Sequence, residues 1–453
     1  MTTTRDEKTS ESAPAPAAAR KLYMEDFGCQ MNKNDAELVV GRMKAAGFER
    51  TEDIEDANVI LYYGCAIREQ AEERVFGRLG ALKPLKRRRP DTVIGVMGCM
   101  AQNQKERIFE RAPHVDLVVG TSRFEEIADF VAEVEHRDRV TALEDGEVAF
   151  RRDLDVRPQG FQAYVTIMRG CNKFCTFCIV PFTQGRERSR PPEDIEDEVR
   201  RLVDDGVVQV TLLGQRVNTY GLDLNRGETL ATLLSRLERI PGLRRLQFIT
   251  SHPTHIDADL MRVIRDHEVH SRYLHLPVQS GSDEVLKKMN RGYTADSYRR
   301  TIDMVKTIVP DMSLATDWIV GFPNETDEDF ERSARLLRDV AFQTSFVFRY
   351  SERAGTNASK RIPDTIPEEV KLHRNHVLLD EQARISERLH SARIGEVHEI
   401  LVEGLSKRDA SRWFGRTSQN WIVVFTSPRD FTGRFVKVRI TSNTALTLFG
   451  ELV

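Results

Sequence analysis

The sequence predicts an α/β protein of three domains, and its pattern of apolar residues supports this fold class in three places. Residues 21–120 alternate short apolar strands with helical stretches, which is typical of a parallel sheet covered by helices. Residues 161–350 continue this alternation through six longer units, which predicts a partial (β/α)6 barrel, because a complete barrel of this type has eight units. Residues 394–453 change to short β-type runs separated by turns, which predicts a small antiparallel β-barrel.

The composition is that of a globular protein with several domains. The chain has 453 residues, of which 40% are hydrophobic and 30% are charged, and its net charge of −3 neither favours nor excludes nucleic acid. No apolar run approaches the roughly 20 residues that a membrane-spanning helix needs, and residues 1–20 lack the apolar segment of a secretory signal. We therefore expect a cytoplasmic monomer without a membrane partner, which begins with a disordered tail over residues 1–20.

In the N-terminal region, each of three predicted strands ends at a Gly-Cys pair that is followed by a helical stretch. These pairs place Cys29, Cys65 and Cys99 at the carboxyl ends of their strands. The carboxyl ends of parallel strands lie at one edge of a sheet, where binding sites form. A single such cysteine is more often a small buried hydrophobic residue, but three in equivalent positions indicate a shared site. With three thiolate ligands, a four-iron cluster would keep one iron free of protein ligands.

The predicted barrel carries a second group of cysteines in the loop after its first strand. Cys171, Cys175 and Cys178 follow the strand-like run 162–168, separated from each other by three and two residues. Three thiolates on one short loop suit an iron–sulfur cluster whose fourth iron is free to bind a small molecule. A zinc site and unpaired structural thiols are the alternatives; zinc would require a fourth Cys or His nearby, and the loop contains none.

The remaining segments complete the domain division. Charged and weakly periodic sequence over residues 137–156 predicts a linker between an N-terminal domain at 21–136 and a barrel domain at 157–390. A proline followed by two glutamates opens one long predicted helix at 367–393. Residues 391–453 form the predicted C-terminal barrel.

The cysteine spacing after the first barrel strand resembles the signature of the radical S-adenosylmethionine superfamily. Together with the N-terminal cysteines, it makes the chain similar to the methylthiotransferase family within that superfamily. The likeness extends over nearly all of residues 21–453, and its C-terminal part resembles the RNA-binding TRAM domain. The motifs that carry the resemblance lie at residues 27–32 (FGCQMN), 65–69 (CAIRE), 98–102 (GCMAQ), 170–181 (GCNKFCTFCIVP), 185–190 (GRERSR), 213–215 (LGQ), 275–281 (HLPVQSG) and 319–323 (IVGFP).

The resemblance implies two [4Fe–4S] clusters, one on each group of three cysteines, with S-adenosylmethionine as the second cofactor. One molecule of S-adenosylmethionine would methylate a sulfur on the N-terminal cluster, and another would be cleaved at the barrel cluster to a 5′-deoxyadenosyl radical. The radical would remove hydrogen from C2 of N6-isopentenyladenosine at position 37 of tRNA, next to the anticodon, and the methylthio group would join that carbon. The implied partners are tRNA and unidentified electron-donor and sulfur-donor proteins.

Two alternatives to this function stay open at the level of the sequence. Other branches of the family modify threonylcarbamoyl-adenosine or a ribosomal protein, although the runs 179–191 and 211–215 resemble the isopentenyladenosine branch. A non-catalytic iron–sulfur protein that binds RNA would carry the same cysteines only to stabilise its fold. The chain also departs from the common pattern of the family at Tyr63-Gly64, at Gln184 and at Arg216; the first departure concerns hydrogen bonding around the N-terminal cluster.

Further residues are expected to contact the cofactors or the RNA. Phe177 lies between two cysteines and is expected either to pack near the adenine of S-adenosylmethionine or to belong to the core. Gln215 and Gln279 lie just past predicted strands, at the end where barrel sites form, so we expect them to contact cofactor or substrate. Arginine suits phosphate contacts, and the predicted RNA-binding residues are Arg186, Arg188, Arg190 and, in the terminal barrel, Arg416.

Overall fold

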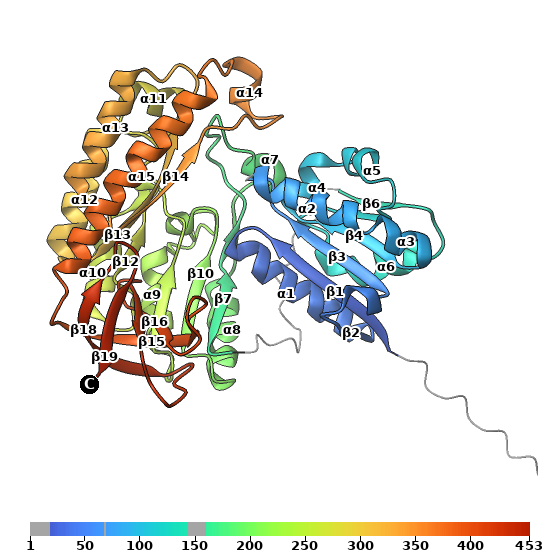
Figure 1. Cartoon of the computed structure of the whole chain (residues 1–453), viewed down its shortest axis with the longest axis horizontal. Coiled ribbons are helices and arrows are strands. Elements are labelled where there is room, and N and C mark those ends of the chain that lie inside the picture. The colour runs from blue at the N-terminus through green and yellow to red at the C-terminus, as the bar shows by residue number, and fades with distance from the viewer. Residues whose placement is uncertain (1–18, 68, 144–159) are drawn as a thin grey trace, which may run out of the picture.

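The computed structural model describes residues 19–67, 69–143 and 160–453, which fold into three domains (Figure 1). Most of the predicted tail at 1–20 and of the predicted linker at 137–156 lies outside the described residues. The N-terminal domain lies beside the central barrel, and the C-terminal barrel lies at one end of it (Figure 1). Within the described part of the chain, no helix combines the length and the apolar character needed to cross a bilayer.

A six-stranded parallel sheet in the order β2-β1-β3-β4-β5-β6 forms the N-terminal domain. Its strands are β1 (Arg20–Phe27), β2 (Phe48–Arg50), β3 (Val59–Gly64), β4 (Val93–Met97), β5 (Leu117–Val119) and β6 (Val140–Ala142). Every residue of β3 is buried, because helices cover both faces of the sheet. Alternate residues of β3 therefore belong to two separate cores, Leu61 to one and Ile60 to the other. The sequence did not predict β2 and β6, which are three residues long and too short to show a pattern.

The helices of this domain divide between the two faces of the sheet. Helices α1 (Gln30–Ala45) and α6 (Ile127–Val134) pack on one face through residues such as Val39 and Phe130. Residues such as Leu79 and Ile108 cover the opposite face. The helices on that face are α2 (Glu69–Ala81), α3 (Lys83–Arg88), α4 (Cys99–Gln104) and α5 (Arg107–Arg111).

The six predicted strand–helix units of the central domain are confirmed as an open barrel. Two three-stranded parallel sheets, β11-β10-β7 and β12-β13-β14, are joined by a bridge between Leu246 and His270. Among the described residues, no pairing joins β7 to β14, so the barrel stays open between these strands. The strands are β7 (Gln162–Thr166), β10 (Gln209–Leu213), β11 (Arg245–Phe248), β12 (Tyr273–His275), β13 (Ser313–Val320) and β14 (Thr344–Arg349). The α-helices are α8 (Pro192–Asp204), α9 (Leu230–Leu237), α10 (Ala258–Asp266), α11 (Asp283–Lys288), α12 (Ala295–Ile308) and α13 (Asp327–Val340).

Short elements connect these units and position the cysteines of the barrel. A two-stranded ribbon of β8 (Met168–Arg169) and β9 (Arg188–Ser189) flanks the loop that carries Cys171, Cys175 and Cys178, and α7 (Val180–Gln184) follows this loop. The other short helices are α14 (Asn357–Arg361) and the 3-10 turns Ile54–Asp56, Phe124–Glu126, Val217–Thr219 and Pro253–His255. The long helix expected at 367–393 is confirmed as α15 (Glu368–Ser391).

The C-terminal domain is a closed barrel of five strands in the order β15-β16-β17-β19-β18. Its pairs are antiparallel except β17 with β19, whose parallel pairing helps to close the barrel. The strands are β15 (Val397–Leu405), β16 (Trp413–Thr417), β17 (Ile422–Phe425), β18 (Phe435–Asn443) and β19 (Leu448–Leu452). This barrel contacts the amino ends of the central strands, since Arg245 donates to the Arg416 carbonyl at 3.0 Å and the Arg272 amide to the Ser418 carbonyl at 3.0 Å.

Candidate active site

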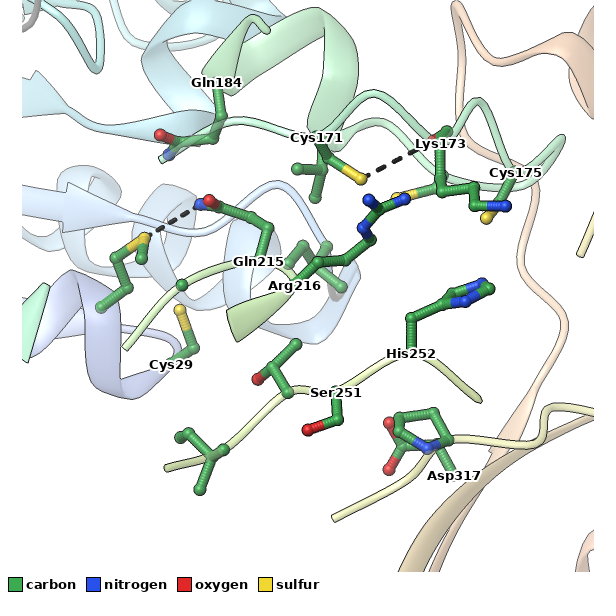
Figure 2. A pocket seen from close by; sticks show the side chains of 18 of the residues that line it. Cys29, Cys171, Lys173, Cys175, Gln184, Gln215, Arg216, Ser251, His252 and Asp317 are labelled. Carbon is green, nitrogen blue, oxygen red and sulfur yellow. Dashed lines mark hydrogen bonds between the residues drawn. The ribbon is translucent and has the colours of Figure 1, made fainter. Parts of the chain in front are cut away.

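All six cysteines line one cavity of about 290 Å³. The cavity lies at the carboxyl ends of β10, β11 and β12, the end of the barrel at which sites form in α/β proteins. The N-terminal domain closes its other side. Figure 2 shows Cys29 on one side of the cavity and Cys171 and Cys175 on the other, with Gln215 and Arg216 between them. The structure thus brings together two groups of thiols that the sequence separates by more than seventy residues.

The register of the N-terminal sheet gathers the first group of cysteines. Phe27 pairs with Gly64 and Tyr63 pairs with Met97, so the three strands end at the same level. Cys29 is the N-cap of α1, Cys99 is the first residue of α4, and Cys65 follows β3 directly. Burial raises the pKa of the Cys99 thiol, and the neighbouring Cys65 and Cys29 raise it further, which shows that the three sulfurs lie within electrostatic reach of each other.

Glycine is required just before Cys99. Gly98 has a φ of +90°, and a Cβ at this position would lie 2.3 Å from the ring of Tyr63. Glycine at this position therefore allows the chain to pass close to Tyr63 between β4 and α4, with Cys99 at the cavity.

Backbone hydrogen bonds fix the second group of cysteines. The Cys171 amide donates to the Gly185 carbonyl at 3.1 Å, and the Thr176 amide donates to the Met289 carbonyl at 3.0 Å. Burial raises the pKa of the Cys178 thiol to about 12, and the adjacent Cys175 and Cys171 contribute to the rise. The loop therefore presents three neighbouring sulfurs from one short segment.

The arrangement of the thiols fits iron–sulfur clusters better than zinc. All six cysteines are free thiols and form no disulfide, even though they all line the same cavity. Across the described residues, no three Cys, His, Asp or Glu side chains are close enough together to hold a single metal ion. A cubane cluster binds each thiolate through a different iron, so its ligands lie further apart than those of one zinc ion. Buried thiols with raised pKa values ionise readily only when positive charge compensates them, which a cluster provides.

Several buried polar atoms in the cavity wall have no hydrogen-bond partner among the residues that the structure describes, and such atoms are expected where a polar ligand binds. They are Gln215 Oε1, Ser251 Oγ, His252 Nε2 and Gln279 Oε1. Burial, together with the cations Arg291, Lys173 and Arg216, lowers the pKa of His252 to about 2, so this imidazole is neutral. The cavity thus offers uncharged polar groups beside the cysteines, which suits the polar atoms of S-adenosylmethionine.

The residues predicted as cofactor contacts all line this cavity. Phe177 also packs against Met289, Phe322 and Tyr350, so its predicted place in the core is confirmed, while contact with the adenine stays a prediction. Gln215 donates to Met31 Sδ at 3.0 Å (Figure 2). Gln279 has a left-handed backbone with a φ of +71° and is held by a bridge to Trp318.

The predicted RNA contacts separate into two classes. Arg186 and Arg188 are exposed. We predicted that Arg190 contacts RNA, but the structure buries it. The residue is only 3% exposed, and its guanidinium donates to Glu198 at 2.6 Å. Arg416 forms an ion pair with Glu403 within the C-terminal barrel, which lies at the end of the central barrel opposite the cavity. The charge of Arg416 is therefore already compensated.

Sequence patterns did not indicate three polar residues that contact the cysteines or their loop. Arg291 is buried and donates to Cys175 Sγ at 3.2 Å, and the Gln184 side chain donates to Cys99 Sγ at 2.9 Å. Arg216 pairs with Glu187 at 3.1 Å beside the barrel loop. The departures at Gln184 and Arg216 from the common family pattern were the only signal in the sequence.

Three known families each match one part of the chain. Residues 21–120 match the uncharacterized protein family UPF0004, residues 165–337 match the radical SAM superfamily, and residues 392–453 match the TRAM domain. Among solved structures, the radical S-adenosylmethionine methyltransferase TsrM from Kitasatospora setae, with cobalamin and a [4Fe–4S] cluster bound, shares the fold. Its TM-score is 0.55 at 14% identity, over 76% of this chain and 77% of that one.

Curated relatives match nearly the whole chain. The tRNA-2-methylthio-N(6)-dimethylallyladenosine synthase of Clostridium botulinum (strain Okra / Type B1) is 42% identical over 96% of this chain and 97% of its own length. The proteins of the same name from Carboxydothermus hydrogenoformans and Parabacteroides distasonis are 44% and 41% identical, each over 96% of this chain, and the matches span 100% and 96% of their lengths. The chain therefore belongs to the tRNA-2-methylthio-N(6)-dimethylallyladenosine synthase family of radical S-adenosylmethionine enzymes.

Proposed function

We propose that this chain adds a methylthio group to C2 of N6-isopentenyladenosine at position 37 of tRNA. The names of its full-length relatives support this substrate and do not favour threonylcarbamoyl-adenosine or a ribosomal protein. The observation that carries the proposal is the shared cavity, because both groups of cysteines and the unpartnered polar atoms line the same space. A protein that used clusters only to stabilise its fold would have no need to direct both of them into such a space.

Each group of cysteines is assigned one cluster. Cys29, Cys65 and Cys99 would hold the N-terminal [4Fe–4S] cluster, and Cys171, Cys175 and Cys178 would hold the second. When bound, the barrel cluster would supply the electron that cleaves S-adenosylmethionine, and the N-terminal cluster would carry the sulfur of the methylthio group. The buried guanidinium of Arg291 lies beside Cys175 and offsets part of the negative charge that thiolates bring into the cavity.

The other cavity residues orient the cofactor and the substrate. Gln215, Ser251 and Gln279 each offer a free polar atom for the polar groups of S-adenosylmethionine. His252 can donate or accept a hydrogen bond without carrying charge, because its pKa lies far below neutrality. Phe177 supplies an apolar wall from the same loop as the cysteines, which suits the adenine and limits the entry of water.

The remaining assignments complete this proposal. The N-terminal domain begins at residue 21 and extends past the predicted limit of 136, because β6 (Val140–Ala142) pairs with β5 in its sheet, so the linker predicted at 137–156 starts too early. The two barrel domains span 157–390 and 391–453. We propose that the exposed Arg186 and Arg188 and the TRAM domain bind the tRNA, and that the enzyme works in the cytoplasm, where a tRNA substrate is present. The chain works as a monomer that receives electrons and sulfur from separate donor proteins.

The test is nucleoside mass spectrometry of tRNA from a strain that lacks this gene. The 2-methylthio form of isopentenyladenosine should disappear, and isopentenyladenosine itself should accumulate. Complementation with the wild-type gene should restore the product, while a Cys171→Ala, Cys175→Ala, Cys178→Ala variant should not. The purified variant should lose about half of the roughly eight irons expected for two clusters. Unchanged methylthiolation in the deletion strain would refute the proposal.

A further inference from the structure

Two large aromatic side chains are half exposed next to the cavity. Phe174 is 49% exposed in the loop between Cys171 and Cys175, and Phe182 is 48% exposed in α7. Their ring centroids are 6.1 Å apart, with the planes inclined at 69°. Exposed rings of this size are unusual on a surface without a ligand, because each leaves apolar area in contact with water.

These rings lie on the segments that form the wall of the cavity. Lys173 and Cys175, on either side of Phe174, line the cavity, and so do Val180 and Gln184 on either side of Phe182. Phe174 and Phe182 themselves are not part of the lining and are open to solvent. The pair therefore stands outside the cavity on the same loop and helix that enclose it.

A lysine completes the group. Lys360, on α14, places its ammonium 6.0 Å from the centre of the Phe182 ring, and it is exposed. Figure 1 shows α14 near α7, at the top of the molecule. We call Phe174, Phe182 and Lys360 the aromatic platform.

Hydrogen bonds hold the platform in a fixed position on the barrel. The Asn290 side chain donates to the Phe174 carbonyl at 2.9 Å. The Ala358 amide of α14 donates to the Thr176 carbonyl of the cysteine loop at 2.7 Å. The exposure of the two rings is thus a property of an anchored surface and not of a loose loop.

We propose that the aromatic platform stacks an unpaired base of the tRNA substrate beside the base that enters the cavity. This inference rests on the proposed function. An adenine reacts inside the cavity only after it leaves the base stack, which costs the free energy of its stacking contacts. Aromatic side chains at the entrance recover part of this cost, because every base has a face that can stack on them.

Charge favours RNA over a protein partner as the occupant of the platform. Lys360 stands over one ring, where it can reach the phosphate of a stacked nucleotide. Arg186 and Arg188, both exposed, follow α7 along the chain and add two cations to the same segment. Two aromatic faces with adjacent cations are the features by which proteins grip single-stranded nucleic acid.

The test compares leucine and tryptophan at the two ring positions. Holoenzyme carrying Phe174→Leu or Phe182→Leu should bind isopentenylated tRNA roughly 5- to 150-fold more weakly, as measured by fluorescence anisotropy. Phe174→Trp and Phe182→Trp keep a stacking face and should stay within a few-fold of wild type. Lys360→Met should reduce the slope of log Kd against log salt by about one. Iron content is measured for each variant. If Phe174→Leu loses iron, the Phe182→Leu variant decides the outcome, because Phe182 does not lie between two cluster cysteines.

The matched control is Leu379→Ser, which removes an exposed apolar side chain from α15 and should leave tRNA affinity unchanged. Equal affinity of wild type and both leucine variants would overturn the platform while leaving the proposed function intact. A loss of turnover only when electrons come from a donor protein, with unchanged tRNA affinity, would assign the surface to that protein and also overturn the proposal. If wild-type enzyme itself neither binds nor modifies tRNA, the proposed function fails.

Discussion

Asp35 and Arg169 form a buried ion pair that joins the N-terminal domain to the barrel. Arg169 Nη1 donates to Asp35 Oδ2 at 2.9 Å, and the two side chains are 4% and 0% exposed, respectively. Asp35 lies on the helix that begins after Cys29, and Arg169 is two residues before Cys171. The Tyr63 hydroxyl donates to the same carboxylate at 2.9 Å, two residues before Cys65. One network thus ties together three segments that carry cysteines of both groups.

The carboxylate of Asp35 keeps Arg169 charged. Burial by itself would lower the pKa of Arg169, but the charge of Asp35 outweighs it and the net shift is upward. Removal of one partner would leave the other buried without compensation. We therefore expect Asp35→Ala to lower the free energy of unfolding by about 3–5 kcal/mol.

Urea denaturation followed by circular dichroism measures this change. The double variant Asp35→Leu, Arg169→Met should recover most of the loss, because it leaves no buried charge. Arg200→Ala is the control: it breaks an exposed pair with Glu196 on the barrel surface and should cost less than about 1 kcal/mol. A loss for Asp35→Ala no larger than that of the control would show that the pair does not join the domains.

Gln184 should set the reduction potential of the N-terminal cluster. Its side chain donates to Cys99 Sγ at 2.9 Å, and hydrogen bonds to cluster sulfurs stabilise the reduced state. Gln184→Leu should lower the midpoint potential, whereas Gln184→Arg, which keeps a donor and adds charge, should not. Redox titration by electron paramagnetic resonance measures this in a background that lacks the three barrel cysteines, so that one cluster gives the signal.

Gln104 is the matched control for this series. It is an amide on α4 that bonds to Glu72, and its replacement by leucine should leave the potential unchanged. The role assigned to Gln184 is wrong if its leucine and arginine variants shift the potential equally, because a general disturbance of packing would do the same.

How far the sequence could predict the site depends on where each signal lies. The cysteines and the strand ends that carry them follow from local patterns, since β3 and β4 are continuous apolar runs that end in Gly-Cys pairs. The Gln184–Cys99 bond joins residues 85 positions apart across two domains, and no periodicity encodes such a contact. The same holds for Tyr63, whose departure from the family pattern has a structural reason only once Asp35 lies beside it.

Arg190 shows the opposite limit of sequence reasoning. Its place in the run GRERSR, close to the cysteine loop, favoured an RNA contact because arginine suits phosphate contacts. In the structure the backbone of Arg188 lies opposite that of Arg169 in the antiparallel β8–β9 ribbon. The side chain of Arg190 is buried and forms an ion pair with Glu198 on α8. Glu198 lies eight residues further on, inside an amphipathic helix. From the sequence alone it cannot be distinguished from a glutamate on the exposed face of that helix.

The neutral state of His252 predicts how stability responds to acid. The folded protein holds the pKa of this buried side chain at about 2, whereas the unfolded chain takes up the proton near the ordinary histidine pKa of 6.5. The unfolded state therefore binds more protons between these values, and stability falls as pH decreases below about 6.5, by up to about 1.4 kcal/mol per pH unit from this group. His252→Gln cannot titrate, so its stability should decrease less between pH 6.5 and pH 5.

Urea denaturation of both proteins at a series of pH values measures the difference. His267→Gln serves as control, because this exposed histidine is replaced without removing a buried imidazole. Parallel pH profiles for wild type and His252→Gln would show that His252 is protonated in the folded state.

The division of the arginines can be tested with one pair of variants. Arg188→Ala removes an exposed cation from the edge of the barrel loop, so tRNA binding should weaken and the salt slope of log Kd should fall by about one, with stability almost unchanged. Arg190→Ala breaks a buried ion pair with Glu198, so it should cost about 3–5 kcal/mol of stability. At temperatures where the Arg190 variant stays folded, its salt slope should equal that of wild type, because the guanidinium does not face the RNA. A reduced slope for Arg190→Ala, together with unchanged stability, would restore the original prediction that this residue contacts phosphate.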